Sequence, residues 1–143
     1  MNYNQCMEYI SSFDRKGAKT QGLKRAQSLM ELVGNPHKAL KFVHIAGTNG
    51  KGSMAQMLSE IFTCQGYRTG LFTSPFIVEY TDRIRINGEN IPKDRLCEIA
   101  EKILPKIQSS PFREDFSQFE ITQAIGFCYF LEEKCDVVVL ETG

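Results

Sequence analysis

The residues best suited to chemistry lie in one short stretch of the sequence, "GTNGKGS". It holds three glycines, a lysine, an asparagine and two hydroxyl side chains. Glycine costs roughly 1 kcal/mol relative to alanine inside regular structure, so three of them indicate a backbone that bends tightly or approaches a partner closely. The lysine indicates that this partner is negatively charged. The stretch predicts a phosphate-binding loop made of Gly47, Thr48, Asn49, Gly50, Lys51, Gly52 and Ser53.

The elements on either side of this loop are those that a phosphate site needs. "FVHIA" before it is a short strand candidate, and the apolar positions after it repeat at helical spacing: Met54, Met57, Leu58, Ile61 and Phe62. The first N–H groups of a helix have no internal partners, and the helix dipole favours an anion there. Lys51 can reach the β- and γ-phosphates of a nucleotide, and Ser53 can offer its hydroxyl to a phosphate or a metal ion. The alternative is a glycine-rich turn with a solvated lysine.

The match to the general P-loop pattern is imperfect. That pattern has a glycine five residues before the second glycine and a Ser or Thr directly after the lysine. Here Ile45 stands at the first position, and Gly52 separates Lys51 from Ser53.

Further along the chain, strand candidates alternate with helical patterns. The other strand candidates are "YRTGLFTS", a hairpin in "RIRINGENI" and the continuous apolar run "DVVVL". Helical spacing of apolar residues covers positions 6–13, 23–33, 96–107 and 116–131, and the inward residues expected in the last two are Leu96, Ile99, Ala100, Ile103, Leu104, Ile107, Ile121, Ala124, Ile125, Cys128 and Leu131. The pattern predicts an α/β fold with a P-loop-type parallel sheet flanked by helices.

Composition narrows the class of protein. The chain has 143 residues with 17 basic and 17 acidic side chains, which argues against a nucleic-acid or membrane role driven by net charge. The five cysteines have no C-x-x-C spacing, so neither a disulfide framework nor a zinc site is indicated. The N-terminus lacks a signal-peptide pattern and no 18-residue apolar run occurs, so we expect a cytoplasmic protein. His44 is expected to be a buried core histidine.

Several blocks in order resemble one family. "AGTNGKGS" is similar to the nucleotide loop of the Mur-type ATP-dependent ligases, and most of all to the folylpolyglutamate synthase/dihydrofolate synthase family. Similar blocks are "GLKRAQSLMELVGNP", "GLFTSPFIVEYTDRIRINGENI", "FEITQAIGFCYF" and "DVVVLETG". The resemblance covers all 143 residues but only about the first third of a full-length member. It implies residues 1–143 to be the N-terminal part of the ATP-binding domain, with the glutamate-binding C-terminal domain absent.

The resemblance implies an enzyme that uses ATP and Mg²⁺ to join L-glutamate to a folate or dihydropteroate through an acyl phosphate. Glu141, at the end of an apolar strand, and Ser74 match positions that hold Mg²⁺. Pterin-contacting segments match at Thr20, Gln21, Ser117, Gln118, Phe119 and Glu120; the alternatives are a core phenylalanine at position 119 and a plain loop at positions 20 and 21. Arg83 and Arg85 on the hairpin could attract the glutamate tail or could be solvated strand arginines. Phe76 departs from the family pattern, which usually has a histidine there.

Two other interpretations stay open: another Mur-type amino-acid ligase, and a non-catalytic nucleotide-binding fragment. The isolated fragment is expected to be inactive. Because the chain stops directly after "DVVVL", we also expect an exposed sheet edge at that strand and self-association through it.

Overall fold

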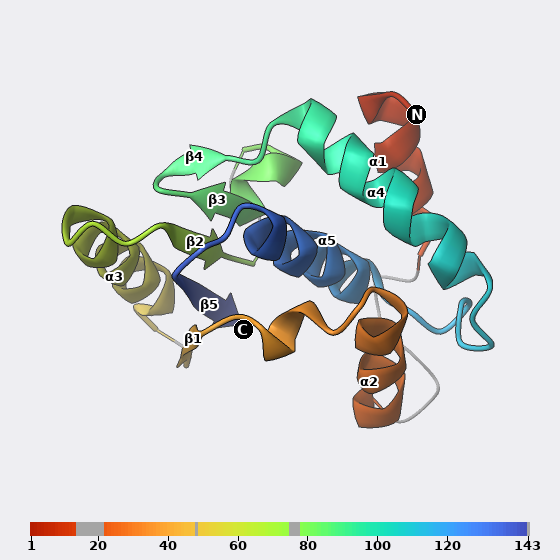
Figure 1. The fold of residues 1–143 in the computed structure, drawn as a ribbon, viewed down its shortest axis with the longest axis horizontal. Helices are drawn as coiled ribbons and strands as arrows, with labels where there is room; N and C mark the ends of the chain where they lie inside the picture. Colours follow the sequence, from red (N-terminus) through yellow and green to blue (C-terminus); the bar gives the residue numbers. More distant parts are fainter. Residues whose placement is uncertain (14–21, 48, 75–77, 143) are drawn as a thin grey trace. The chain divides into compact units, whose positions relative to one another are not determined.

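The computed structural model describes residues 1–13, 22–47, 49–74 and 78–142, and they form two compact units (Figure 1). The first unit holds residues 1–37 and 93–129, and the second holds residues 38–92 and 130–143. The assignment of the whole chain to part of one ATP-binding domain stays a prediction.

The first unit is helical. It contains α1 (Tyr3–Ser11), α2 (Gly22–Leu32), α4 (Lys93–Gln108) and most of α5 (Gln118–Glu132). A capping box begins α1: the Asn2 side chain accepts from the backbone N–H of Gln5 at 2.8 Å, and the Gln5 side chain accepts from that of Asn2 at 2.9 Å. All six apolar residues predicted to face inward from α4 are buried.

Two of the predicted helical stripes are only partly right. In the part of α2 whose side chains the structure describes, Arg25 and Leu29, spaced by one turn, are buried, whereas Ala26 and Met30 of the predicted apolar series are half-buried. In α5 the predicted Ile121, Ala124 and Ile125 are fully buried, but Cys128 is half-buried and Leu131 is 37% exposed. Phe127, Tyr129 and Phe130 are buried instead. Since apolar side chains surround nearly the whole of α5, a search for one inward stripe describes it poorly.

The second unit is built on a sheet with the strand order β1-β5-β2-β3-β4. The strands are β1 (Phe42–Ala46), β2 (Thr69–Phe72), β3 (Ile84–Ile86), β4 (Glu89–Asn90) and β5 (Val137–Thr142). The first three in spatial order are parallel, and β3 and β4 add to β2 in antiparallel fashion. The sheet is therefore mixed, and the predicted parallel arrangement holds for three of its five strands.

The predicted hairpin is confirmed, and its turn has the expected backbone. Asn87 and Gly88 have φ values of 49° and 83°, so both are in the left-handed region that a two-residue hairpin turn requires. Short 3₁₀ helices lie before β1 and β3: η1 (Pro36–Lys38) and η2 (Tyr80–Arg83).

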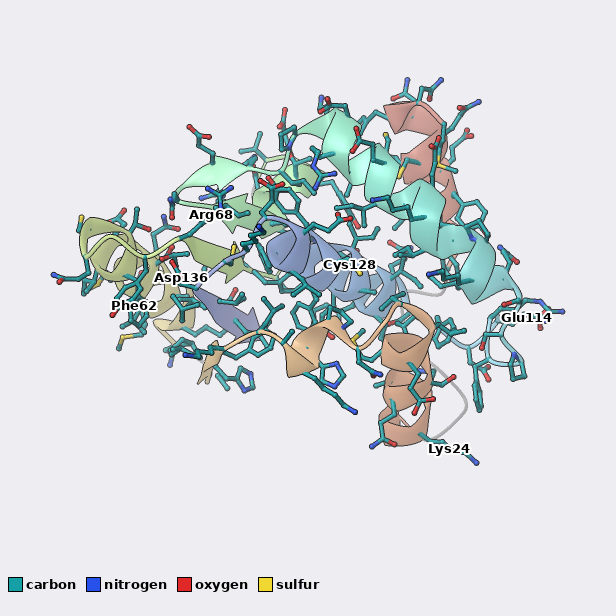
Figure 2. The ribbon with its side chains drawn as sticks, in the orientation of Figure 1. Lys24, Phe62, Arg68, Glu114, Cys128 and Asp136 are labelled. Atoms are coloured by element: carbon teal, nitrogen blue, oxygen red, sulfur yellow. The ribbon has the colours of Figure 1, made fainter. Side chains whose placement is uncertain are left out.

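The expected exposed edge at "DVVVL" is wrong. Strand β5 pairs with β1 on one side and with β2 on the other, so its backbone groups are hydrogen-bonded in both directions. At the start of this pairing, the backbone N–H of Arg68 donates to the Asp136 carboxylate at 2.7 Å, and the N–H of Asp136 donates to the Arg68 carbonyl at 2.8 Å (Figure 2). The sheet edges among the described residues are β1 and β4, and self-association stays a prediction.

Helix α3 (Lys51–Cys64) packs on the face of β1, β5 and β2, and only part of the predicted stripe faces the strands. Ala55, Leu58 and Phe62 meet Leu71 and Val139 of the sheet. Met54, Met57 and Ile61 are instead more than half exposed. Small residues on the inward side, Ala55 and Ser59, let the helix approach the strands closely, and hydrophobicity alone does not signal this.

His44 is exposed on β1 of the second unit, so the expected core histidine is wrong.

No helix among residues 1–13, 22–47, 49–74 and 78–142 is long and apolar enough to cross a membrane.

Candidate functional site

The parallel strands bring the predicted phosphate loop and the predicted metal ligands to one edge of the sheet. Because β1, β5 and β2 run in the same direction, their carboxyl ends lie together. The loop beginning at Gly47 follows β1, Glu141 lies near the end of β5, and Ser74 follows β2 by two residues. Ligands of open α/β sheets bind at such an edge.

Glu141 is a buried acid on the side of the sheet that faces α3. It follows Val139 by two residues, so both side chains point toward that helix. Glu141 is only 4% exposed. Its Oε1 lies 3.7 Å from the ammonium nitrogen of Lys51, and its Oε2 accepts the backbone N–H of Ser74 at 3.0 Å.

This carboxylate is compensated by one cation and one backbone donor, as a buried charge must be. The donor set suits a hard cation such as Mg²⁺, which prefers oxygen ligands and completes its shell with water and phosphate oxygens. Within the described ranges, no three His, Cys, Asp or Glu side chains cluster in a way that could hold a metal ion. A cation beside Glu141 would therefore depend on the Ser74 hydroxyl and on the nucleotide itself.

Two glycines and the start of α3 define the described part of the predicted phosphate loop. Gly47 and Gly50 have φ values of 143° and 73°, which favour glycine. Lys51 begins α3, and Gly50 at the N-cap has no side chain to satisfy the N–H groups of the first turn. Asn49 and Ser53 are exposed along this loop, and Thr48 lies outside the described residues.

Neither the backbone conformation nor the packing of the described residues requires a glycine at position 52. Its φ is not in the left-handed region, and a Cβ built on it would meet no described atom within 4 Å. By contrast, a Cβ at Gly70 would come within 2.8 Å of the Phe130 ring, so Gly70 is required by packing. A glycine in the first turn of α3 without a packing reason fits close approach of a ligand from outside the protein.

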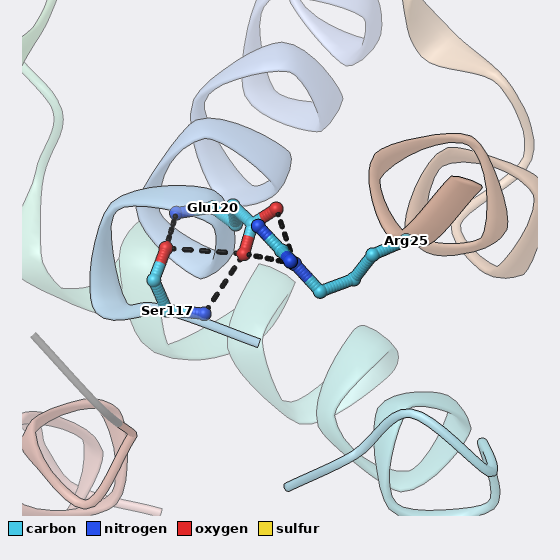
Figure 3. Close-up of polar contacts among 3 residues, drawn as sticks. All are labelled: Arg25, Ser117 and Glu120. Carbon is cyan, nitrogen blue, oxygen red and sulfur yellow. Dashed lines mark hydrogen bonds and ion pairs between the residues drawn. The ribbon is translucent and has the colours of Figure 1, made fainter. Parts of the chain in front are cut away.

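The predicted substrate residues at the start of α5 form a hydrogen-bonded cluster of their own in the first unit (Figure 3). The Ser117 hydroxyl accepts the N–H of Glu120 at 3.2 Å, while the N–H and hydroxyl of Ser117 donate to Oε1 of Glu120 at 2.9 and 3.1 Å. The Gln118 side-chain amide donates to the carbonyl oxygens of Ser11 and Phe13. Phe119 is half-buried, and Thr20 and Gln21 lie outside the described residues.

Arg25 is a member of this cluster that sequence reasoning missed. Its Nε donates to both carboxylate oxygens of Glu120, at 2.9 and 3.0 Å (Figure 3). The pattern Ser-x-x-Glu at positions 117–120 is a capping-box signal and could have shown that Glu120 has an internal role. No pattern in the sequence indicates that the partner of Glu120 lies on α2.

Thr73, Val78 and Glu79 are each hydrogen-bonded to residues of η2. The N–H of Thr73 donates to the Arg83 carbonyl at 3.0 Å. The Asp82 carboxylate accepts the N–H groups of Glu79 and Val78, both at 2.9 Å. These two donors, with the Asn90 side chain on β4, lower the pKa of Asp82 to about 2.

Arg85 on β3 and Arg83, which the structure places at the end of η2 and not on the hairpin, have partners within the second unit. The Arg85 guanidinium lies 3.8 Å from the Asp82 carboxylate, and that of Arg83 lies over the Tyr80 ring at 5.5 Å from its centre. Their expected attraction for a glutamate tail stays a prediction, and Phe76 lies outside the described residues.

Comparison with known proteins points to one group of relatives, although no family model matches the chain. The chain is 36% identical over 146 residues to the folylpolyglutamate synthase of Lacticaseibacillus casei, covering all of this chain and 34% of the relative. It is 35% identical to the dihydrofolate synthase/folylpolyglutamate synthase of Bacillus subtilis, covering 99% of this chain and 33% of the relative. The chain thus spans about a third of the length of these relatives.

Solved structures agree with these relatives. The folylpolyglutamate synthase of Thermotoga maritima matches with a TM-score of 0.87 and 37% identity over 99% of this chain and 33% of that one. A complex of the same kind of synthase with AMPPCP and folate matches with a TM-score of 0.88 and 35% identity, over 100% and 35%. The Mycobacterium tuberculosis synthase complexed with ADP matches with a TM-score of 0.88 and 32% identity, over 99% and 32%.

Proposed function

We propose that this chain, whose homologues are folylpolyglutamate and dihydrofolate synthases, is the N-terminal, nucleotide-binding part of an ATP-dependent ligase. The complete enzyme would add L-glutamate to a folate or a dihydropteroate, and so would serve folate biosynthesis and one-carbon metabolism in the cytoplasm. The observation that carries the proposal is the buried Glu141 carboxylate between the Lys51 ammonium and the Ser74 N–H, beside a glycine-rich loop.

The loop Gly47–Ser53 would bind the phosphates of ATP. Its positive-φ glycines and the start of α3, which has no side-chain cap, support this assignment, and Lys51 would add a full positive charge there. Relatives solved with AMPPCP or ADP support a nucleotide as the ligand.

Mg²⁺ would bind beside Glu141 and the Ser74 hydroxyl, where it would neutralise phosphate charge. With a metal ion at the carboxylate, Lys51 is no longer its main counter-charge and can pair with phosphate oxygens. Glu141 would thus pair with Lys51 in the metal-free site and hold Mg²⁺ in the loaded site.

The reaction would follow from this charge arrangement. A carboxylate oxygen of the pterin substrate attacks the γ-phosphorus of ATP, the bond to the bridging oxygen breaks, and ADP leaves. The glutamate amine then attacks the acyl carbon of the acyl phosphate, an amide forms, inorganic phosphate leaves and the amine loses a proton. The first step brings two anions together, so Lys51 would act by stabilising negative charge on the transferring phosphoryl group.

The pterin would bind in the first unit at the segment Ser117–Glu120 and at Thr20 and Gln21. A relative solved with folate supports this class of substrate. The Phe119 ring could stack on the flat pterin.

A turnover assay tests the proposal. Residues 1–143 are incubated with Mg²⁺, ATP, glutamate and either dihydropteroate or tetrahydrofolate, beside a longer protein that covers the full length of the relatives. We expect a glutamylated product and ADP from the long protein only, because bringing three reactants together contributes about 7–11 kcal/mol to lowering the barrier. Product from residues 1–143 above a Lys51→Ala control contradicts the expected inactivity.

The same experiment separates the other interpretations. A long protein that hydrolyses or transfers phosphate with another amino-acid acceptor, but binds no pterin, would favour a different Mur-type ligase. A long protein that binds ATP without any turnover would favour a non-catalytic nucleotide-binding module.

A further inference from the structure

We propose that Arg25 is a positioning residue for the pterin-binding segment and acts through Glu120, which itself does not contact the pterin. The inference rests on the proposed function and assigns roles within that site. It departs from the interpretation of all four residues Ser117–Glu120 as direct substrate contacts.

The Arg25–Glu120 pair is largely withdrawn from solvent and geometrically specific. The two side chains are only 10% and 13% exposed. The Nε–H of Arg25 is shared between both oxygens of the carboxylate, at 2.9 and 3.0 Å, so the arginine fixes the direction of the carboxylate as well as its charge. The pair joins α2 to α5 over a long separation in sequence (Figure 3).

The carboxylate is already engaged on its other side by the helix start. Oε1 of Glu120 accepts both the N–H and the hydroxyl of Ser117, and these bonds close the capping box of α5. Three donors thus reach the carboxylate: the N–H and hydroxyl of Ser117, both on Oε1, and the Nε–H of Arg25, shared between Oε1 and Oε2. We assign Glu120 to holding this segment in place, because all three donors belong to the segment itself or to α2.

Two helices thus hold the first turn of α5 from different directions. The Gln118 amide is bound to the carbonyls of Ser11 and Phe13 at the end of α1, and Glu120 is bound to Arg25 of α2. Phe119 lies between these two fixed residues. The arrangement orients the Phe119 ring, which is the group in this segment with the shape to stack on a pterin.

Removing the guanidinium would leave a partly buried carboxylate with only the Ser117 donors among the described residues. Such a group turns toward water, and this change disturbs the first turn of α5. Lysine at position 25 restores the charge but lacks the planar Nε–H that spans both oxygens, so it should restore only part of the effect.

A double-mutant cycle on two binding affinities tests the proposal. The variants are Arg25→Met, Glu120→Gln and the pair together, with Arg25→Lys as the conservative change. Tetrahydrofolate and Mg·ATP are titrated separately into each protein by calorimetry. Arg95→Met is the matched control, since it removes an arginine of the same unit that pairs with exposed Glu98 at 2.7 Å.

We expect each single change to weaken tetrahydrofolate binding tenfold or more and to leave Mg·ATP affinity within twofold. The double variant should be no weaker than Arg25→Met, Arg25→Lys should lie between wild type and Arg25→Met, and the control should match wild type. If Arg25→Met fails to fold, Arg25→Lys replaces it in the cycle.

Three results would overturn the inference. Unchanged tetrahydrofolate affinity in both single variants would remove the positioning role. Additive losses would mean that Glu120 contacts the ligand independently of Arg25. Equal losses of tetrahydrofolate and Mg·ATP binding would mean that the pair only supports the general fold. A wild-type protein that binds neither ligand contradicts the proposed function before any variant is compared, so the two failures are distinguishable.

Discussion

The ammonium nitrogen of Lys51 lies 3.7 Å from a carboxylate oxygen of the buried Glu141, although the two residues are far apart in the sequence. Lys51 begins the helix after the glycine-rich loop, and Glu141 lies near the end of the central strand β5. The contact places the proposed phosphate-binding cation and the candidate metal ligand together at the sheet edge. Each compensates the charge of the other, so replacing either one should change how the site holds a cation and a nucleotide.

Replacing Glu141 with glutamine should separate its role toward Mg²⁺ from its role in the fold. The change keeps the shape and removes the charge. We expect the gain in ATP affinity that Mg²⁺ provides to fall strongly, while ATP affinity in EDTA stays nearly unchanged. Calorimetric titrations with and without Mg²⁺ measure both quantities.

Asp136→Asn is the matched control for this comparison, because it removes an acid near the start of the same strand. It should leave both affinities as they are. If Glu141→Gln weakens binding equally with and without Mg²⁺, Glu141 is structural and the metal assignment is wrong.

Replacing Gly52 with alanine should weaken ATP binding without harming the fold. Neither φ nor packing requires glycine there, so alanine should leave the free energy of unfolding unchanged or raise it by up to about 1 kcal/mol. The added methyl group would lie where a phosphate must approach the backbone. Urea unfolding and ATP titration of the same variant check both parts.

Gly70→Ala provides the opposite case. Its new Cβ would lie 2.8 Å from the Phe130 ring, so we expect a loss of about 1–3 kcal/mol in the free energy of unfolding.

Equal ATP affinity of wild type and Gly52→Ala would show that Gly52 does not adjoin the nucleotide.

Asp82 should make the free energy of unfolding depend on pH in the acidic range. Its hydrogen bonds hold the pKa at about 2 in the folded protein, below the ordinary value of about 3.9 for an unfolded aspartate. Its contribution to stability is therefore complete above the unfolded pKa and is lost as pH falls toward 2. Urea unfolding from pH 6 to pH 2.5 should show Asp82→Asn less stable than wild type at pH 6, with the difference shrinking below pH 4.

The exposed Glu89 on β4 supplies the control for this series. Glu89→Gln should follow the wild-type pH profile. A constant difference between wild type and Asp82→Asn at every pH would show that the charge of Asp82 is not what stabilises the hairpin.

The positions at the ends of the parallel strands could be predicted from the sequence, because polar or glycine-rich residues directly follow apolar runs there. The loop after Ala46 and the acid after "DVVVL" both follow apolar runs, and parallel strands must bring such positions to one edge. In α4, clean helical spacing on a polar background left only one inward face, and all six predicted residues are buried.

Other features depend on partners that local patterns do not reveal. Met54, Met57 and Ile61 are apolar but exposed, since the sheet accepts the smaller Ala55 and Ser59 at close approach. Arg25 has a sequence context typical of a solvated residue, and only the distant Glu120 explains its burial.

The central claim is that the loop Gly47–Ser53 binds the phosphates of ATP, and its most direct test is calorimetric titration of Mg·ATP into wild type and Lys51→Ala. Lys41→Ala, which replaces a lysine just before β1, is the control. Loss of a charge-assisted contact should weaken binding in Lys51→Ala by about 2 kcal/mol or more, roughly thirtyfold, and leave the control like wild type. Equal ATP affinity in wild type and Lys51→Ala would contradict the account.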